Sequence, residues 1–165
     1  MNGSSDISGA LIPLNHIRFC NMLEHTATDI RVSRHSDTQE DFTPEYLLEE
    51  LGNEFFSDDF ACPDKTFLDN SCGNGNILLY VIGKRLDCGM TYMESLSTVY
   101  GIDLMADNIA ECHERIKRLL DERCIEYDES EVDAVLQHNI VCYDALDWDY
   151  DNWKPKPKYE SHSLF

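Results

Sequence analysis

Basic residues are scarce in this sequence, which has 13 Lys and Arg against 32 Asp and Glu and a formal net charge of −19. A protein that holds nucleic acid unaided needs clustered Lys and Arg against the phosphates. The composition therefore argues against a broad basic binding face. Contact with nucleic acid would have to use a local patch, such as the KPKPK run at 154–158, or a partner protein.

Long apolar runs and paired-cysteine motifs are missing too. No run approaches the roughly 18 apolar residues of a membrane span, and the first residues contain no signal-peptide pattern. The seven cysteines are odd in number and form no CxxC pair, and the histidines lack metal-ligand spacing. We therefore expect reduced thiols in a cytoplasmic compartment, no membrane contact and no metal.

The segments that are present alternate between short apolar stretches and helical patterns. The apolar stretches predict buried strands at 66–69, 98–103 and 140–146. The helical spacing of apolar residues predicts four helices, at 42–56, 77–88, 91–98 and 107–123, and a short helix at 134–139. Gly89 is expected to end the second of these helices. This order is typical of an α/β fold with a parallel sheet and right-handed crossovers.

The chain divides into three parts by composition. Residues 1–40 read as a polar leader with a weak helix, residues 41–150 as the α/β domain, and residues 151–165 as a polar tail. The acidic stretch 125–133 reads as a loop. The aromatic residues around the start of the tail, Trp148, Tyr150 and Trp153, could stack on a base, but we expect them to pack against the sheet.

A glycine-paired turn follows the first predicted strand, in the stretch FLDNSCGNGN at 67–76. Gly73 and Gly75 allow a sharp turn and a close approach of a ligand to the backbone. The dinucleotide fingerprint needs a third glycine where this chain has Leu78, and the Gly-Lys-Ser/Thr of a P-loop is absent. The turn therefore does not favour a phosphate ligand.

Each of the three predicted strands ends in an aspartate, at Asp69, Asp103 and Asp144. Ligands of parallel α/β sheets bind at the carboxyl ends of the strands. Asp69 would attract a cation such as an amino group. Asp103, 28 residues after Gly75, can accept both hydroxyls of a ribose, and Asp144 can accept from the exocyclic amine of adenine. An amine, a ribose diol and an adenine together describe S-adenosylmethionine.

Four segments in order, FTPEYLLEEL, FLDNSCGNGNIL, VYGIDLMADNIAECHERI and HNIVCYDAL, resemble the cofactor-binding half of S-adenosylmethionine-dependent DNA adenine-N6 methyltransferases. The nearest relatives would be modification subunits of restriction systems and their small phage or prophage versions. The resemblance implies a Rossmann-like methyltransferase fold with a parallel sheet, shortened on its C-terminal side. It covers roughly residues 42–146.

The resemblance also implies roles for individual residues. Thr43 and Pro44 would lie beside the methionine carboxylate, and Asp69, Gly73 and Gly75 would form the turn around the methionine part. The remaining residues would surround the nucleoside. They are Asp103 at the ribose hydroxyls, Leu104 and Met105 against the adenine face, and Asp144 and Ala145 at the adenine edge.

The chain departs from the family in two places. Asn70 stands where the family often has proline, and asparagine also tolerates turn geometry. The Asn/Asp-Pro-Pro-aromatic loop, which holds a flipped adenine, occurs nowhere in the sequence, so no catalytic residue is assigned.

Three readings therefore stay open. The chain could methylate DNA, either with a partner subunit that supplies the loop or as a minimal subunit itself. It could also bind the cofactor without methylating, as a sink or regulator of modification systems. It could instead be an acidic mimic of DNA that blocks a restriction enzyme. The open edge of a short sheet would be covered by an N-terminal helix or by a second copy of the chain.

Overall fold

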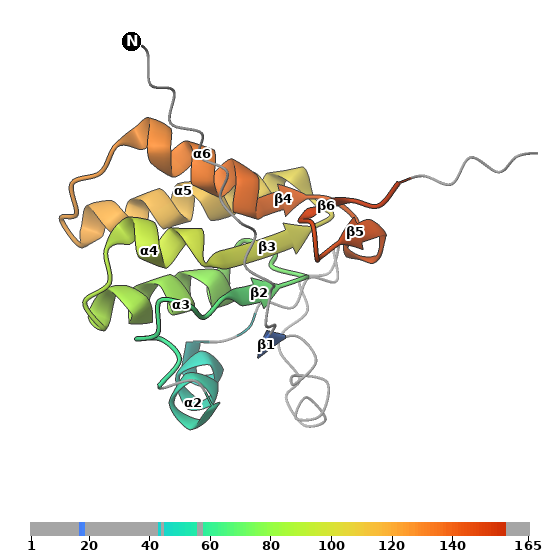
Figure 1. Ribbon diagram of the computed structural model, residues 1–165. Helices are drawn as coiled ribbons and strands as arrows, with labels where there is room; N and C mark the ends of the chain where they lie inside the picture. The colour runs from blue at the N-terminus through green and yellow to red at the C-terminus, as the bar shows by residue number, and fades with distance from the viewer. Residues whose placement is uncertain (1–16, 19–42, 44, 56–57, 158–165) are drawn as a thin grey trace, which may run out of the picture.

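The computed structural model describes residues 17–18, 43, 45–55 and 58–157 (Figure 1). Its centre is a parallel sheet with the strand order β1-β2-β3-β4. The strands are β1 (Ile17–Arg18), β2 (Phe67–Asp69), β3 (Val99–Asp103) and β4 (Ile140–Cys142). The α/β class and the parallel pairing of the three predicted strands are confirmed.

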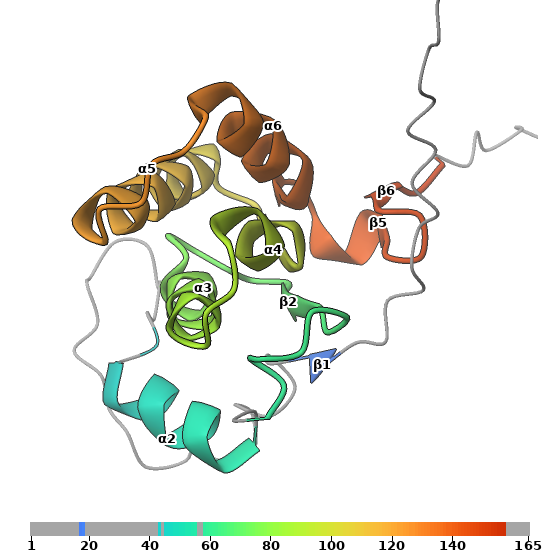
Figure 2. The same ribbon diagram turned by 60° about the vertical axis from the view of Figure 1, so that its left-hand side comes forward.

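Helices connect successive strands and lie together on one side of the sheet, as Figure 2 shows for α3 to α6. The five helices of the described ranges are α2 (Glu45–Phe55), α3 (Asn76–Asp87), α4 (Tyr92–Ser97), α5 (Ala106–Glu122) and α6 (Glu129–Asn139). The helix after the glycines ends as predicted, with Gly89 at a φ of 85° just past it.

The strands alternate their side chains between two cores. Phe67, Val99 and Ile140 face the helices and belong to the larger apolar cluster. Leu68 and Ile102 point to the opposite face and belong to a second cluster. This period-2 pattern follows from strand geometry, and it means that both faces of the sheet are buried.

The second face is covered by the C-terminal segment. After a 3₁₀ turn (Ala145–Asp147), β5 (Trp148–Asp149) and β6 (Lys154–Pro155) pair antiparallel and bring Trp148 and Trp153 onto the sheet. The two indole rings meet edge to face with centroids 5.3 Å apart, and Trp153 Nε1 donates to the His138 carbonyl at 2.6 Å. The predicted packing of these aromatic residues on the sheet is confirmed.

Three local predictions need correction. Helix α6 begins at Glu129, not at residue 134, because the Asp128 carboxylate caps it by accepting from Ser130 and Glu131 N–H. Strand β4 ends at Cys142, so Asp144 lies beyond the strand and caps the 3₁₀ turn instead. Ile17 and Arg18, in the segment predicted as leader and weak helix, form a strand paired with Phe67 and Leu68.

Candidate functional site

The glycine turn connects the end of β2 to the start of α3. Gly73 and Gly75 have φ angles of 50° and 91°, values that residues with a side chain rarely adopt. The turn is closed by a bond from Gly75 N–H to the Cys72 carbonyl, at 2.8 Å. Helix α3 then begins at Asn76, so its N-terminal end lies directly against the turn.

Asp103 ties this turn to the neighbouring strand. Its Oδ2 accepts from Gly73 N–H at 3.0 Å, across 30 residues of sequence. Its Oδ1 accepts from Met105 N–H at 2.8 Å and from Asn108 Nδ2 at 3.3 Å. Each carboxylate oxygen can accept two hydrogen bonds, and Asp103 is partly exposed, so Oδ2 has capacity for a further donor.

Asp69 lies beneath the turn and is only 3% exposed. Its Oδ1 accepts from Ser71 N–H at 3.1 Å. The pKa of this carboxyl is raised to about 6: burial, the largest cause, and the negative charge of Asp103 raise it, and the hydrogen bond from Ser71 N–H lowers it. Two carboxylates therefore share the carboxyl edge of β2 and β3, where a cation would be favoured.

Asp144 and Ala145 follow β4 and are not hydrogen-bonded to this unit in the described part of the chain. Asp144 is exposed, and its Oδ1 accepts from Leu146 N–H at 2.9 Å. Leu104 is 68% exposed and Met105 47% exposed, directly after Asp103. The carboxyl edge of the sheet therefore presents carboxylate acceptors beside two exposed apolar side chains, Leu104 and Met105.

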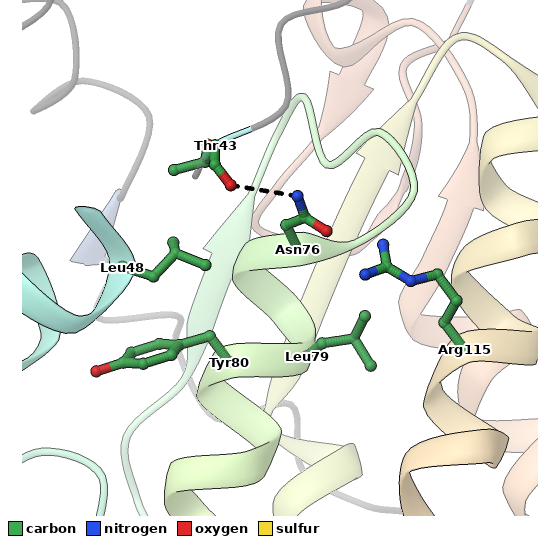
Figure 3. Close-up of a pocket in the computed structure, with 6 residues that line it drawn as sticks. All are labelled: Thr43, Leu48, Asn76, Leu79, Tyr80 and Arg115. Atoms are coloured by element: carbon green, nitrogen blue, oxygen red, sulfur yellow. Dashed lines mark hydrogen bonds between the residues drawn. The ribbon is translucent and has the colours of Figure 1, made fainter. Parts of the chain in front are cut away.

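Thr43 lies near the start of α3, at a cavity of about 430 Å³ (Figure 3). Its carbonyl accepts from Asn76 Nδ2 at 3.2 Å, which places Thr43, two residues before α2, against the first residue of α3. Pro44 falls outside the described residues. The cavity is lined by Thr43, Leu48, Asn76, Leu79, Tyr80 and Arg115.

Sequence reasoning missed two polar residues of this cavity, Asn76 and Arg115. Arg115 lies on α5, and its Nη1 donates to the Asn74 carbonyl in the glycine turn at 2.8 Å. The only sequence signal is that Asn76 directly follows the glycines. Arg115 has no such signal, since helical spacing does not show which neighbour its side chain meets.

Gly75 has a structural reason to be glycine that involves no ligand. A Cβ at this position would overlap the Sγ of Cys112 on α5. Cys112 itself is fully buried. The turn therefore packs tightly on α5, and of the two glycines only Gly73 donates its N–H to a carboxylate at the sheet edge.

The predicted residues fall into two groups around one turn. Asp69, Gly73, Gly75 and Asp103 form a single bonded unit at the carboxyl edge, with Leu104 and Met105 beside it. Thr43 lies at the cavity on the α2 side. Two histidines lie in the helices near the sheet: His113 Nε2 is hydrogen-bonded to the Ile140 carbonyl, and His138 is exposed.

Comparison of the chain with protein-family models, with curated proteins and with solved structures finds no match. Within the described ranges, no group of three or more His, Cys, Asp or Glu side chains is placed to hold a metal ion. No helix of those ranges has the length and apolar character needed to span a membrane.

Proposed function

We propose that this chain binds S-adenosylmethionine at the carboxyl edge of its sheet, on a Rossmann-like methyltransferase fold, and serves DNA adenine-N6 methylation. One observation carries the proposal. The Gly73 N–H and the partly exposed Asp103 carboxylate are joined at 3.0 Å, which holds a glycine turn and a hydroxyl-accepting acid together at adjacent strand ends.

The residues at this edge fit the parts of that cofactor. Asp103 Oδ2 retains capacity for a ribose hydroxyl, and the exposed Leu104 and Met105 offer an apolar surface to a purine ring. Asp144 and Ala145, one strand further, would meet the adenine edge. Asp69, buried beneath the turn, would favour the cationic end of the ligand through its charge.

The cofactor supplies an activated methyl group when it is bound. What this chain would contribute is positioning, because catalysis of such a transfer depends on holding donor and acceptor in line. No residue here is assigned to the adenine N6 amine. We therefore propose that DNA reaches the site through a partner subunit of a restriction-modification system, in the cytoplasm.

Titration calorimetry with S-adenosylmethionine and S-adenosylhomocysteine tests the binding. We expect binding by the wild type and a loss of about 20-fold or more in Asp103→Ala, because a charged acceptor of the ribose hydroxyls is removed. Glu126→Ala, which removes one exposed acid from the α5–α6 loop, is the charge-matched control and should bind as the wild type does. Absence of binding by the wild type would end the proposal.

A second function is favoured by the charge of −19 and by the absence of an Asn/Asp-Pro-Pro-aromatic stretch. The chain would then bind the cofactor without methylating, as a sink or regulator of modification systems. Transfer of labelled methyl groups to adenine-containing DNA, with and without candidate partner subunits, separates the two. Incorporation that needs this chain and is lost in Asp103→Ala supports methylation, whereas cofactor binding without incorporation supports the second function.

A further inference from the structure

The face of the sheet opposite the helices is covered less completely than the helix side. On the helix side, β2, β3 and β4 each place a side chain that is only 1% exposed: Phe67, Val99 and Ile140. On the opposite face, three side chains in or just after β3 and β4 stay partly exposed: Tyr100, Val141 and Tyr143. Within the described ranges, that face is covered by the hairpin of β5 and β6, whose strands have two residues each (Figure 2). Because parallel sheets are normally covered on both faces, this face leaves apolar surface for a further molecule.

The hairpin also leaves one buried donor without an acceptor. Trp148 is 5% exposed, and its Nε1 meets no acceptor among the described residues. Trp153 Nε1, by contrast, donates to the His138 carbonyl. Buried donors are normally paired, so the hairpin alone does not complete the cover of this face.

Leu146, in the 3₁₀ turn before β5, is 81% exposed and is held in that position by the hairpin. Its carbonyl accepts from Lys156 Nζ at 2.6 Å. The carbonyl before it, that of Ala145, accepts from the Tyr150 hydroxyl at 2.9 Å. An exposed apolar side chain on a fixed turn can enter a pocket of another molecule with little loss of conformational entropy.

The charges around Leu146 favour a basic partner. Residues 144–156 contain four aspartates and two lysines, in a chain with a net charge of −19. Three of these aspartates are exposed: Asp144, Asp147 and Asp151. A second copy of the chain, a nucleic acid or an anionic membrane would bring negative charge against them and be repelled. A protein whose apolar contact is surrounded by Lys and Arg would be attracted instead.

We propose that this segment is the docking surface for a basic protein partner, with Leu146 as its apolar anchor. The docking surface has three apolar or aromatic side chains at its centre and three acids around them: Tyr143, Leu146 and Tyr150, with Asp144, Asp147 and Asp151. The 3₁₀ turn joins the carboxyl end of β4 to the hairpin, so a protein bound there borders the edge where the cofactor is proposed to bind. The inference rests on the proposed function for the identity of the partner, because the subunit that brings DNA must supply the positive charge that this chain lacks.

The probe is a dye-labelled helical peptide with leucines along one face and arginines along the other. We expect the chain to bind it with a Kd of about 10–100 μM, measured by anisotropy at about 150 mM salt, where long-range charge effects are screened. Both tryptophans of the chain, Trp148 and Trp153, lie in the hairpin. A change in their emission on titration therefore places the peptide at the docking surface.

Two variants remove the apolar anchor and the acids separately. Leu146→Ser should weaken peptide binding by about fivefold or more, and Asp147→Asn with Asp151→Asn by about threefold or more. Each has a matched control elsewhere: Tyr46→Ser removes an exposed apolar side chain from α2, and Glu122→Gln with Glu126→Gln removes two exposed acids. Both controls should bind the peptide within about twofold of the wild type.

The proposal is overturned if a peptide with serine in place of every leucine binds equally well, or if the controls weaken binding as much as the hairpin variants, since charge alone would then explain it. It is also overturned if neither peptide binds. A dimer of the wild type that Leu146→Ser abolishes would assign the surface to a second copy and overturn it too. The titration needs no cofactor, so these results leave cofactor binding untouched, and a failure to bind S-adenosylmethionine leaves the docking surface standing.

Discussion

At the scale of single residues, the buried carboxylate of Asp69 lowers the free energy of unfolding at neutral pH, although it lies at the candidate site. Its pKa is raised from 3.8 to about 6, chiefly by burial, although Ser71 N–H donates to it. The unfolded chain exposes the same carboxyl to water, so its pKa there is ordinary. Between these two values the folded protein binds more protons, and the free energy of unfolding therefore falls as pH rises from about 4 to about 6.

We predict that Asp69→Asn stabilises the protein at pH 7.5 by up to about 2 kcal/mol, because the amide keeps an oxygen for Ser71 N–H and carries no buried charge. The gain should shrink as the pH falls to about 4 and vanish near pH 3, where the wild-type carboxyl is protonated in the folded protein and largely protonated in the unfolded chain. Urea unfolding of the wild type and of Asp69→Asn at pH 7.5 and about pH 4 measures the difference in their free energies of unfolding. The contributions of the other acids are the same in both proteins and cancel in this difference.

The same variant should bind S-adenosylmethionine more weakly at pH 7.5, since the negative charge beneath the turn is lost. Glu126→Gln, an exposed site, should change neither the stability difference between the two pH values nor the binding. A stability difference that stays constant from pH 4 to 7.5 would show that the Asp69 carboxyl does not titrate differently in the folded protein.

At the scale of elements, the contact between the glycine turn and α5 is the tightest feature of the site. Gly75 has a φ of 91°, and a side chain there would overlap Cys112 Sγ. Gly75→Ala should therefore lower the free energy of unfolding by about 2–4 kcal/mol, from backbone strain and overpacking together. Denaturant unfolding measures this loss.

A double-mutant cycle separates the two causes of that loss. Cys112→Ala alone leaves a small void, but in the Gly75→Ala background it removes the overlap and should recover about 1–2 kcal/mol relative to additivity. Strict additivity of the two changes would mean that the turn and α5 do not meet at these atoms.

Much of the element order could be predicted from the sequence, because short apolar strands and amphipathic helices have distinct periods. The start of α6 could not, since only Val132, Leu136 and Asn139 of that helix are buried and its first turn is acidic and solvated. The strand at Ile17–Arg18 has two residues and shows no periodicity of its own. Its position is set by pairing with β2, which is tertiary information.

Part of the candidate site could also be predicted from the sequence. Asp69, Gly73, Gly75 and Asp103 could be grouped from their positions at strand ends, because parallel strands bring these ends together. Arg115 could not, since its place at the cavity depends on how α5 rotates against the glycine turn. Asp144 was predicted as a strand end because an apolar run does not show where pairing stops, and β4 ends two residues earlier.

The hairpin of β5 and β6 is the element that covers the second sheet face, and Trp153 is its main anchor. Trp153 is 6% exposed, lies 4.7 Å from the Tyr100 ring centroid and donates to the His138 carbonyl. Trp153→Ala should cost about 3–5 kcal/mol in urea unfolding. Trp153→Phe keeps the ring packing but loses the donor and should cost about 1–2 kcal/mol. A cost below about 1 kcal/mol for the alanine variant would contradict this role.

At the scale of the whole molecule, the formal net charge is −19. Most basic side chains of the described residues are paired with acids or buried, so they form little positively charged surface. Four basic residues there are in ion pairs with acids: Lys65, Lys84, Lys117 and Arg123. Arg85 is fully buried against Phe67 and the Cys62 carbonyl. Arg118 is exposed on α5, and Lys154 and Lys156 are exposed together at the C-terminal end of the described chain, so beyond that pair the exposed basic residues do not make the contiguous basic surface that phosphates require.

Because the exposed basic residues are few, we expect the chain to reach DNA through a partner and not to bind it alone. Fluorescence anisotropy of a labelled adenine-containing duplex, at about 50 mM salt, should show no binding by the chain alone at tens of micromolar. Long-range repulsion between the acidic surface and the phosphates is strongest at low salt, so lowering the salt should not create binding.

If binding does appear and weakens steeply with salt, a local basic patch exists, and Lys154→Ala together with Lys156→Ala should abolish it. With no binding alone, DNA methylation by this chain requires a partner that supplies the basic surface, and the acidic exterior becomes the complement through which such a partner can dock.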